Sequence, residues 1–215
     1  MDIQNDKKRG NIWKVTKNKV MTPVTNGLHA DYSPTLSPDE SKLAYISTAS
    51  GAAQIHIKWL NTGQTGQMTH LTGSPSNLSW SPDGKMLAFS QFVKGTPKSP
   101  VNLSGKPEGA KWADSAIFID DLFYRADGAG YIPAGNMLQL TDRIGPDNSP
   151  LVSPDGKLIA YLGYDEKYTN YENTQLYIMD ANGGVSRSLT SEFDRSVGSI
   201  KWASDSKGLY LSYDD

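Results

Sequence analysis

Short apolar runs alternate with polar turns along this chain, and one pattern of turn and strand occurs four times. The four copies cover residues 36–45, 80–89, 152–161 and 202–211, and three of them contain Ser-Pro-Asp. Proline presets φ at the second turn position, aspartate caps the turn through its side chain, and glycine tolerates the exit conformation. An apolar residue precedes each turn and a β-forming run follows it, so the pattern predicts four hairpins.

The strand after each turn is apolar on both faces. In the second copy Leu87 and Phe89 lie on one face and Ala88 on the other, which predicts a strand that is covered on both sides. A further strand is predicted after each hairpin, at residues 11–15, 54–57 and 175–180. A last short strand then ends in an apolar-threonine pair: Val24-Thr25, Leu71-Thr72, Leu140-Thr141 and Leu189-Thr190. Four short strands in sequence make one blade of a β-propeller.

We therefore predict an all-β fold, a β-propeller of about four four-stranded antiparallel blades. The turns at Ser37 and Ser81 are one blade apart, about 40–50 residues, as are those at Ser153 and Ala203. The interval from Ser81 to Ser153 is too long, because residues 94–136 form an irregular excursion rich in Pro and Gly, with short strands near 116–120 and 122–125. The whole chain, 1–215, is assigned to propeller repeats, with blades at about 32–72, 73–142 and 143–192.

Half-blades are predicted at the two ends, residues 1–31 and 193–215. The first brings the last two strands of a blade and the second brings the first two. These halves can pair and close a small ring, because closure removes exposed strand edges. Alternatively, the chain is part of a larger propeller and its edges are open to self-association.

Composition and charge narrow the possible functions. The net charge is −2, and the only notable basic run is Lys7-Lys8-Arg9, so we expect no nucleic-acid partner. There are no cysteines, which excludes disulfides and thiolate chemistry. The sequence shows no signal peptide and no segment that could span a bilayer, so we expect no membrane association; the compartment stays open.

The repeat resembles the WD40-like repeat of TolB-type proteins and of prolyl-oligopeptidase-family (S9) serine peptidases. The segments that carry the second resemblance are residues 110–114, 119–120, 124–131, 140–147, 194–197 and 213–215. They are typical of acylaminoacyl and dipeptidyl peptidases of that family and occur in the family's order. The resemblance implies a propeller that restricts access of peptides to an α/β-hydrolase domain and supports that domain. It leads us to expect a truncated chain without the catalytic domain.

No residue is assigned a catalytic, cofactor-binding or metal-binding role. The nucleophile elbow Gly-x-Ser-x-Gly is absent, and the nearest match, at residues 184–188 around Ser186, lacks the final glycine. His29, His56 and His70 are therefore expected to be surface or packing residues. The pairs Asp120-Asp121 and Asp214-Asp215 are not expected to chelate one ion, because adjacent strand residues point to opposite faces.

Two loops remain candidate contact surfaces. Residues 164–173 carry three tyrosines with mixed charge, which often mark a contact surface. We favour packing of this loop onto its blade over binding, because amphipathic rings serve both purposes. Arg125, Asp127 and Tyr131 suit either a substrate-facing loop or a turn held by local hydrogen bonds.

Two functions follow from the sequence. The first is a non-catalytic propeller segment of a serine peptidase, with a peptide substrate or a hydrolase domain as partner. The alternative is a stand-alone TolB-like propeller that binds a protein partner. A glycan-processing propeller ranks below both, because the acidic residues are scattered at turns instead of facing each other across a pocket.

Overall fold

The computed structural model describes residues 9–93, 114–121, 124–125, 132–133, 137–143, 145–167 and 171–213. These residues form strands, turns and bridges and contain no helix, so the predicted all-β class is confirmed. Within the same ranges no helix is available to cross a membrane.

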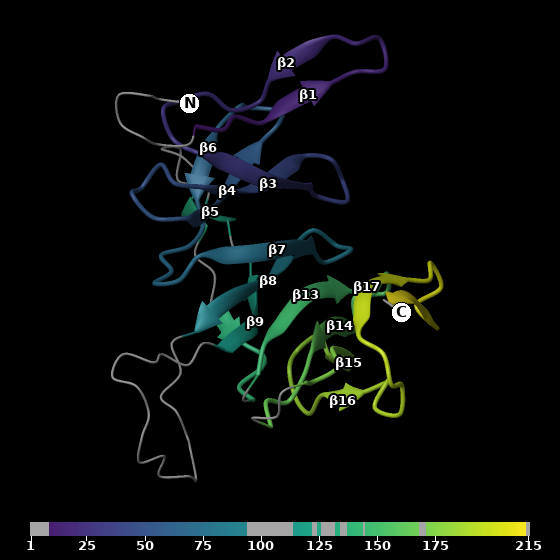
Figure 1. Ribbon diagram of the computed structural model, residues 1–215. Coiled ribbons are helices and arrows are strands. Elements are labelled where there is room, and N and C mark those ends of the chain that lie inside the picture. Colours follow the sequence, from purple (N-terminus) through teal and green to yellow (C-terminus); the bar gives the residue numbers. More distant parts are fainter. Residues whose placement is uncertain are drawn as a thin grey trace, which may run out of the picture.

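Three four-stranded antiparallel sheets form the body of the molecule (Figure 1). The first contains β3 (Asp31–Leu36), β4 (Lys42–Ser47), β5 (Gln54–Trp59) and β6 (Thr65–Gln67). The second contains β7 (Pro75–Trp80), β8 (Met86–Val93), β9 (Asp114–Asp121) and β12 (Met137–Gln139). The third contains β13 (Asp147–Val152), β14 (Leu158–Gly163), β15 (Gln175–Asp180) and β16 (Arg187–Ser188). In each sheet the strands pair in chain order, as in propeller blades.

The excursion predicted at residues 94–136 is only partly irregular. It contains β9, which pairs with β8 from Asp114 opposite Val93 to Asp121 opposite Met86. It also contains a hairpin of β10 (Tyr124–Arg125) and β11 (Ile132–Pro133). The excursion therefore supplies the third strand of the second sheet.

Two smaller sheets flank the three complete ones. They are β1 (Trp13–Val15) with β2 (Met21–Pro23), and β17 (Val197–Trp202) with β18 (Leu209–Tyr213). In the structure they are separate two-stranded sheets and lie at different places in Figure 1. Within the described residues the two halves do not pair with each other, so closure into a small ring is not shown.

A threonine hydrogen bond identifies the last two strands of a blade. The backbone N–H of Ile55 donates to Thr69 Oγ1 at 2.9 Å, and that of Leu176 donates to Thr190 Oγ1 at 2.9 Å. The same bond joins Ile12 N–H to Thr25 Oγ1 at 3.0 Å, so β1 and β2 have the geometry of a third and a fourth strand.

This bond also corrects one expectation. The apolar-threonine pair of the first sheet is Met68-Thr69, not Leu71-Thr72. Leu71 lies beyond β6, where the Gln54 side chain accepts from its N–H at 2.8 Å and donates to its C=O at 2.9 Å.

The Ser-Pro-Asp turns have the predicted hydrogen bonds. In the second sheet Ser81 Oγ donates to Asp83 Oδ1 at 2.7 Å, the Lys85 N–H donates to the same carboxylate at 3.1 Å, and the Met86 N–H donates to Ser81 Oγ at 2.9 Å. The hydrogen bonds from Ser81 and Lys85 lower the pKa of Asp83. The fourth residue of each turn has positive φ, and it is Glu40 (φ 56°) in the first sheet and Gly84 (φ 66°) in the second.

Hydrophobic cores lie between neighbouring sheets. One contains Ile55, Ile57 and Met68 of the first sheet with Leu87 and Phe89 of the second. Leu87, Ala88 and Phe89 are all 0% exposed, so the prediction that this strand is covered on both faces is confirmed. The remaining cores join the second sheet to the third, the third to β17–β18, and the first to the β1–β2 sheet.

Two tryptophans tie neighbouring first strands together. Trp80 at the end of β7 donates its indole N–H to the Thr35 carbonyl on β3 at 3.1 Å. Trp202 at the end of β17 donates to the Leu151 carbonyl on β13 at 3.0 Å. The same contact at two interfaces indicates one mode of sheet stacking along the molecule.

Candidate functional site

The three histidines do not form a catalytic triad in the described part of the chain. His56 lies in β5 and is buried, His29 is half-buried before β3, and His70 is exposed after β6. Ser186 lies just before β16, in a loop of the third sheet and not at a strand–helix turn. No hydroxyl is hydrogen-bonded to any of these imidazoles among the described residues.

A repeated β-bulge shapes the first strand of each complete sheet. Ser33, Asn77 and Ser149 have φ values of 52°, 53° and 53°, and each lies where the register with the second strand shifts. Non-glycine residues seldom adopt this conformation. Sequence reasoning missed the bulge, although each of these three residues stands four positions before the serine that opens the following turn.

The bulged strands converge on a groove of about 270 Å³. Leu78 on β7, Pro150 and Leu151 on β13 and Ile200 on β17 give it apolar walls, and Asn77, Ser149 and Ser199 add polar groups. The first strands of neighbouring blades face the axis of a propeller. This axial groove is therefore a concave surface formed by strands of three neighbouring sheets.

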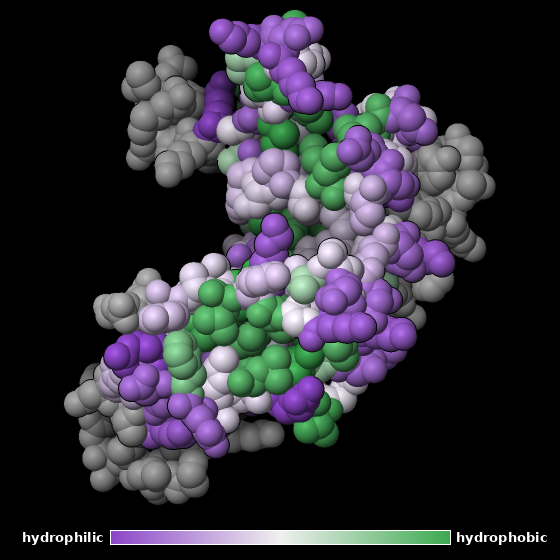
Figure 2. Space-filling model, turned by 90° about the vertical axis from the view of Figure 1, so that its right-hand side faces the viewer, coloured by the Kyte–Doolittle hydropathy of each residue, from purple (hydrophilic) through white to green (hydrophobic). Residues whose placement is uncertain are grey.

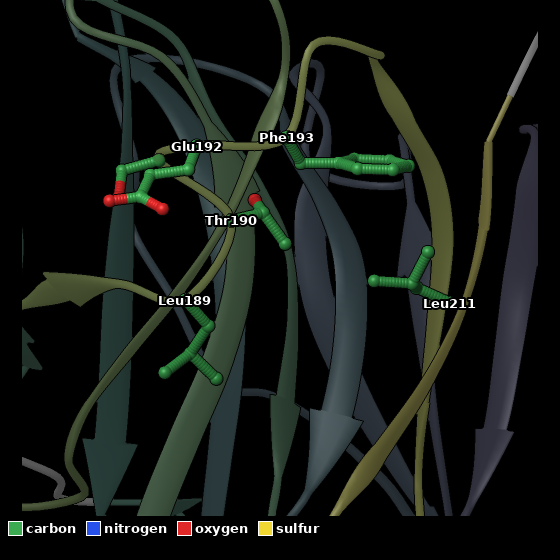
Figure 3. Close-up of a pocket in the computed structure, with 6 residues that line it drawn as sticks. Leu189, Thr190, Glu192, Phe193 and Leu211 are labelled. Atoms are coloured by element: carbon green, nitrogen blue, oxygen red, sulfur yellow. The ribbon is translucent and has the colours of Figure 1, made fainter.

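A second pocket, of about 450 Å³, lies beside β18 (Figure 3). In the figure, Phe193 and Leu211 lie on one side of it and Leu189 on the other. Leu211 is 38% exposed, whereas Tyr45, Phe89 and Tyr161 at the equivalent place in the complete sheets are 4% exposed or less. The pocket thus exposes a side chain at a position that the complete sheets bury.

A buried ion pair lies between the second and third sheets. The Arg143 guanidinium contacts Asp147 at the start of β13, binds Asp165 at 3.0 Å, and stacks 3.7 Å from the centre of the Tyr177 ring. Asp147 is 1% exposed, and burial raises its pKa while Arg143 opposes that shift. Tyr161 stacks on Tyr177, with ring centres 5.4 Å apart, and burial raises the pKa of Tyr161 to about 12. This cluster joins strands of the third sheet.

The first sheet repeats the cluster without the arginine. Asp31 starts β3, and Tyr45 lies opposite His56 with ring centres 5.7 Å apart. The His29 Nε2 lies 3.8 Å from Asp31 Oδ1, beyond hydrogen-bond range, and neither that oxygen nor His56 Nε2 has a hydrogen-bond partner. Burial lowers the pKa of His56, which favours the neutral imidazole.

The remaining candidates do not assemble into a site. Within the described ranges no three His, Asp or Glu side chains are placed to hold a metal ion. In the 164–173 loop, Tyr164 is half-buried and Tyr171 is 73% exposed, while Tyr168 lies outside the described residues. Asp127, Tyr131 and the pair Asp214-Asp215 also lie outside the described residues, and Arg125 is described only as part of strand β10.

In comparison with known proteins, the chain is similar in sequence to peptidases and to a TolB homologue. It is 27% identical over 172 residues to the peptidase YuxL of Bacillus subtilis, covering 74% of this chain and 26% of that protein. It is 29% identical over 138 residues to dipeptidyl-peptidase 5 of Porphyromonas gingivalis, covering 63% of this chain and 17% of that protein. It is 29% identical over 161 residues to the TolB homologue of Chlorobium luteolum, covering 68% and 36%. No family model matches the chain.

Solved structures share the fold. The TolB-like protein of Agrobacterium tumefaciens aligns with a TM-score of 0.57 at 19% identity, covering 95% of this chain and 70% of that one. A puromycin-hydrolysing peptidase of Mycobacterium tuberculosis gives 0.63 at 14% identity, covering 96% and 32%. The oligogalacturonate lyase of Vibrio parahaemolyticus gives 0.67 at 12% identity, covering 95% and 52%. These three proteins have different functions, so the likeness describes the fold alone.

The chain spans about a quarter of the length of YuxL and about a third of that of the TolB homologue. Its similarity to the peptidases is a similarity of sequence as well as of fold, and the strand order is that of propeller blades. The chain thus has a TolB-like β-propeller fold, and its relatives in sequence include peptidases of the prolyl-oligopeptidase (S9) family and a TolB homologue.

Proposed function

We propose that this chain acts as a non-catalytic propeller segment of a prolyl-oligopeptidase-family serine peptidase. In this role it limits the access of peptides to a hydrolase domain outside residues 1–215 and supports that domain. The observation that carries the proposal is the sequence similarity to two peptidases over 172 and 138 residues.

The distribution of reactive side chains supports a non-catalytic role. The sequence has no Gly-x-Ser-x-Gly motif, which a serine hydrolase of this kind uses to present its nucleophile. In the described residues the histidines sit in or beside the first sheet, without a serine hydroxyl bonded to them. A triad works only when nucleophile, base and carboxylate meet in one geometry.

The axial groove supports a role in access. Its lining combines apolar side chains with hydroxyl and amide groups, which suits transient contact with an extended peptide. The bulges at Asn77 and Ser149 shape the strands that line the groove.

Two measurements test the proposal. The purified chain should neither hydrolyse peptidyl-nitroanilides nor be labelled by a serine-reactive fluorophosphonate. The encoding DNA should continue in frame into an α/β-hydrolase domain. Turnover that the fluorophosphonate abolishes would refute the non-catalytic role, and a reading frame with no such domain on either side would refute the peptidase context.

A stand-alone TolB-like module that binds a protein partner is the second candidate. The 29% identity to a TolB homologue over 161 residues favours it. In that case the purified chain should be monomeric, should melt cooperatively and should capture the same protein in repeated pulldowns. A gene that encodes no hydrolase domain, together with a protein partner captured in this way, would support the binding role over the peptidase role.

A further inference from the structure

The buried aspartate of the first sheet lacks the arginine that its counterpart in the third sheet contacts. Residues 24–31 align without a gap with residues 140–147, from the apolar-threonine pair to the aspartate that starts the first strand. In the third sheet the residue four positions before Asp147 is Arg143, whose guanidinium contacts that carboxylate. In the first sheet the residue at the equivalent position is Gly27, so the arginine of this cluster is missing.

The carboxylate and the aromatic pair of the cluster are present in the first sheet. Asp31 is 5% exposed. Tyr45 on β4 lies opposite His56 on β5, with ring centres 5.7 Å apart. The corresponding rings in the third sheet are those of Tyr161 and Tyr177, and the guanidinium stacks on the ring of Tyr177. The imidazole of His56 is therefore the equivalent stacking surface.

A buried oxygen of the first sheet shows what is missing. Asp31 Oδ1 has no hydrogen-bond partner. A buried carboxylate is stable only when a cation or hydrogen-bond donors meet it, and Arg143 fills this need for Asp147. His56 does not supply the cation, because burial lowers its pKa and favours the neutral imidazole. A neutral ring also presents its face to a cation without repelling it.

The loop beside the cluster also differs between the two sheets. In the third sheet Asp165, in the loop after β14, forms a second ion pair with Arg143 at 3.0 Å. In the first sheet the corresponding loop after β4, residues 48–53, has only small, uncharged side chains. This loop therefore supplies neither a cation nor a long side chain that would close the site.

His29 lies where an arginine at position 27 would extend. Its Nε2 lies 3.8 Å from Asp31 Oδ1, beyond hydrogen-bond range, and a Cβ on Gly27 would lie 2.5 Å from its ring. The His29 side chain is 35% exposed, so its ring can turn outward into solvent. His29 thus covers the carboxylate without satisfying it.

We propose that Asp31 and His56 form a binding site for a guanidinium group, the arginine side chain of a peptide, which takes the place of the His29 ring. The guanidinium donates to the Asp31 carboxylate and stacks on the imidazole of His56, as Arg143 does with Asp147 and Tyr177. Arginine is favoured over lysine because its planar group both stacks and donates. The inference goes beyond the proposed function and does not rest on it, since the site lies within this chain.

A titration with an arginine peptide tests the site directly. The probe is acetyl-Gly-Arg-Gly-amide, and its control is the same peptide with citrulline, which has the shape of arginine without the charge. Nuclear magnetic resonance follows the imidazole signals of His56 and His29, with the exposed His70 as the internal reference. One charge-assisted pair and one stacking contact give an affinity in the millimolar range. The arginine peptide should shift the His56 signal saturably at such concentrations, and the citrulline peptide should not.

Variants assign the contacts. Asp31→Asn should weaken binding of the arginine peptide about tenfold or more, because it removes the charge and keeps the size of the side chain. Asp83→Asn is the matched control, because the Asp83 side chain is 54% exposed in a turn of the second sheet, and it should change the affinity less than about twofold. His56→Phe keeps an aromatic face and should bind within about twofold of the unmodified chain, whereas His56→Ala should bind about threefold more weakly or worse.

Thermal melts show that the loss of binding is not a loss of folding. Asp31→Asn removes an unpaired charge from the interior, so without peptide it should melt at or above the temperature of the unmodified chain. Asp147→Asn should melt at a lower temperature, because it leaves the guanidinium of Arg143 without its buried partner.

Nonspecific adsorption of the peptide gives a different pattern. Hydrophobic side chains gather in the lower half of Figure 2, beside β17 and β18, whereas the first sheet lies in the upper half. Adsorption on the hydrophobic surface would shift signals of β17 and β18 and leave that of His56 in place.

The outcomes separate the alternatives. A saturable shift of His56 by the arginine peptide alone, lost in Asp31→Asn, supports the proposal. Binding to His29→Ala but not to the unmodified chain overturns it, because His29 then closes the site permanently. Equal shifts with both peptides, no shift of His56, or undiminished binding to Asp31→Asn also overturns it. None of these results bears on fluorophosphonate labelling or on the reading frame, so failure of this inference stays distinct from failure of the proposed function.

Discussion

Replacing Trp80 by phenylalanine tests the contact that joins the first two sheets. Trp80 is 8% exposed, packs in the core between those sheets, and donates its indole N–H to Thr35 at 3.1 Å. Phenylalanine keeps an aromatic ring but removes the donor and leaves space where the second ring stood.

The expected cost follows from these two losses. A hydrogen bond between protein groups contributes about 1 kcal/mol net. The lost apolar contact of the smaller ring adds about 1 kcal/mol, at roughly 0.8 kcal/mol for each buried methylene equivalent. The free energy of unfolding should therefore fall by about 2 kcal/mol, which lowers the melting temperature by about 4–8 °C in a chain of this size.

Urea denaturation followed by circular dichroism near the β-sheet minimum measures this change without relying on tryptophan emission. Trp13→Phe is the matched control, because Trp13 is 51% exposed and its replacement should change stability by less than about 0.5 kcal/mol. Equal losses for Trp80→Phe and Trp13→Phe would refute the reasoning, since the indole contact between sheets would then carry no stability.

Three further predictions concern the turns and the buried ion pair. Glu40 has φ of 56°, so Glu40→Gly should raise the free energy of unfolding by about 0.5–1 kcal/mol. Gly84→Ala at the equivalent position should lower the free energy of unfolding by a similar amount. Urea denaturation midpoints of the two variants check this. Arg143→Met should lower the free energy of unfolding by about 3–5 kcal/mol, because Asp147 is 1% exposed and would be left buried without its cation. Thermal melts of this variant and of Asp165→Asn separate the contribution of the buried contact from that of the exposed one. Hydrogen bonds from serine hydroxyls and backbone N–H groups lower the pKa of the three turn carboxyls in the folded state, so their stabilisation is complete above the unfolded value of 3.8 and is lost as pH falls below it. Urea midpoints at decreasing pH should fall more steeply for the parent chain than for a variant with all three carboxyls changed to amides, at Asp39, Asp83 and Asp155.

The turns and the strands beside them were predictable because their signals are local. Ser-Pro-Asp fixes a turn within four residues, and the apolar run after it reads as a strand covered on both faces. The structure keeps these features, with Ser81 and Asp83 bonded as expected and Ala88 fully buried.

Features that depend on partners far along the chain were missed or misplaced. Two apolar-threonine pairs stand three residues apart after β5, and only the bond from Ile55 to Thr69 shows which one belongs to the blade. The strand predicted near residues 116–120 lies within β9, but the sequence did not show that this strand is the third of the second sheet, because its pairing with β8 spans a long insertion. The buried aspartate of the Arg143–Asp147 pair had a sequence signal, because Asp31 and Asp147 both stand six residues before a turn serine. The aromatic pair beside each aspartate had none, because its two residues lie on different strands.

In the candidate site, too, local features were predictable and features built from distant segments were not. The sequence excluded a nucleophile elbow because that motif is contiguous. The axial groove is formed by Leu78, Leu151 and Ile200 from three different sheets, so no single segment of the sequence describes it. The bulges that shape the groove contain non-glycine residues at positive φ, a conformation that the residue types alone do not predict.

The central claim is that the repeats stack as neighbouring blades in one repeated geometry. Nuclear magnetic resonance of the indole protons tests it most directly, because the contacts join residues 45 and 51 positions apart in the sequence. The indole N–H of Trp80 should show nuclear Overhauser contacts to Thr35 and Leu36, that of Trp202 should show them to Leu151 and Val152, and both should exchange with solvent more slowly than that of the exposed Trp13. Indole protons of Trp80 and Trp202 that exchange as fast as that of Trp13 and show contacts only within their own hairpins would contradict the stacked-blade structure.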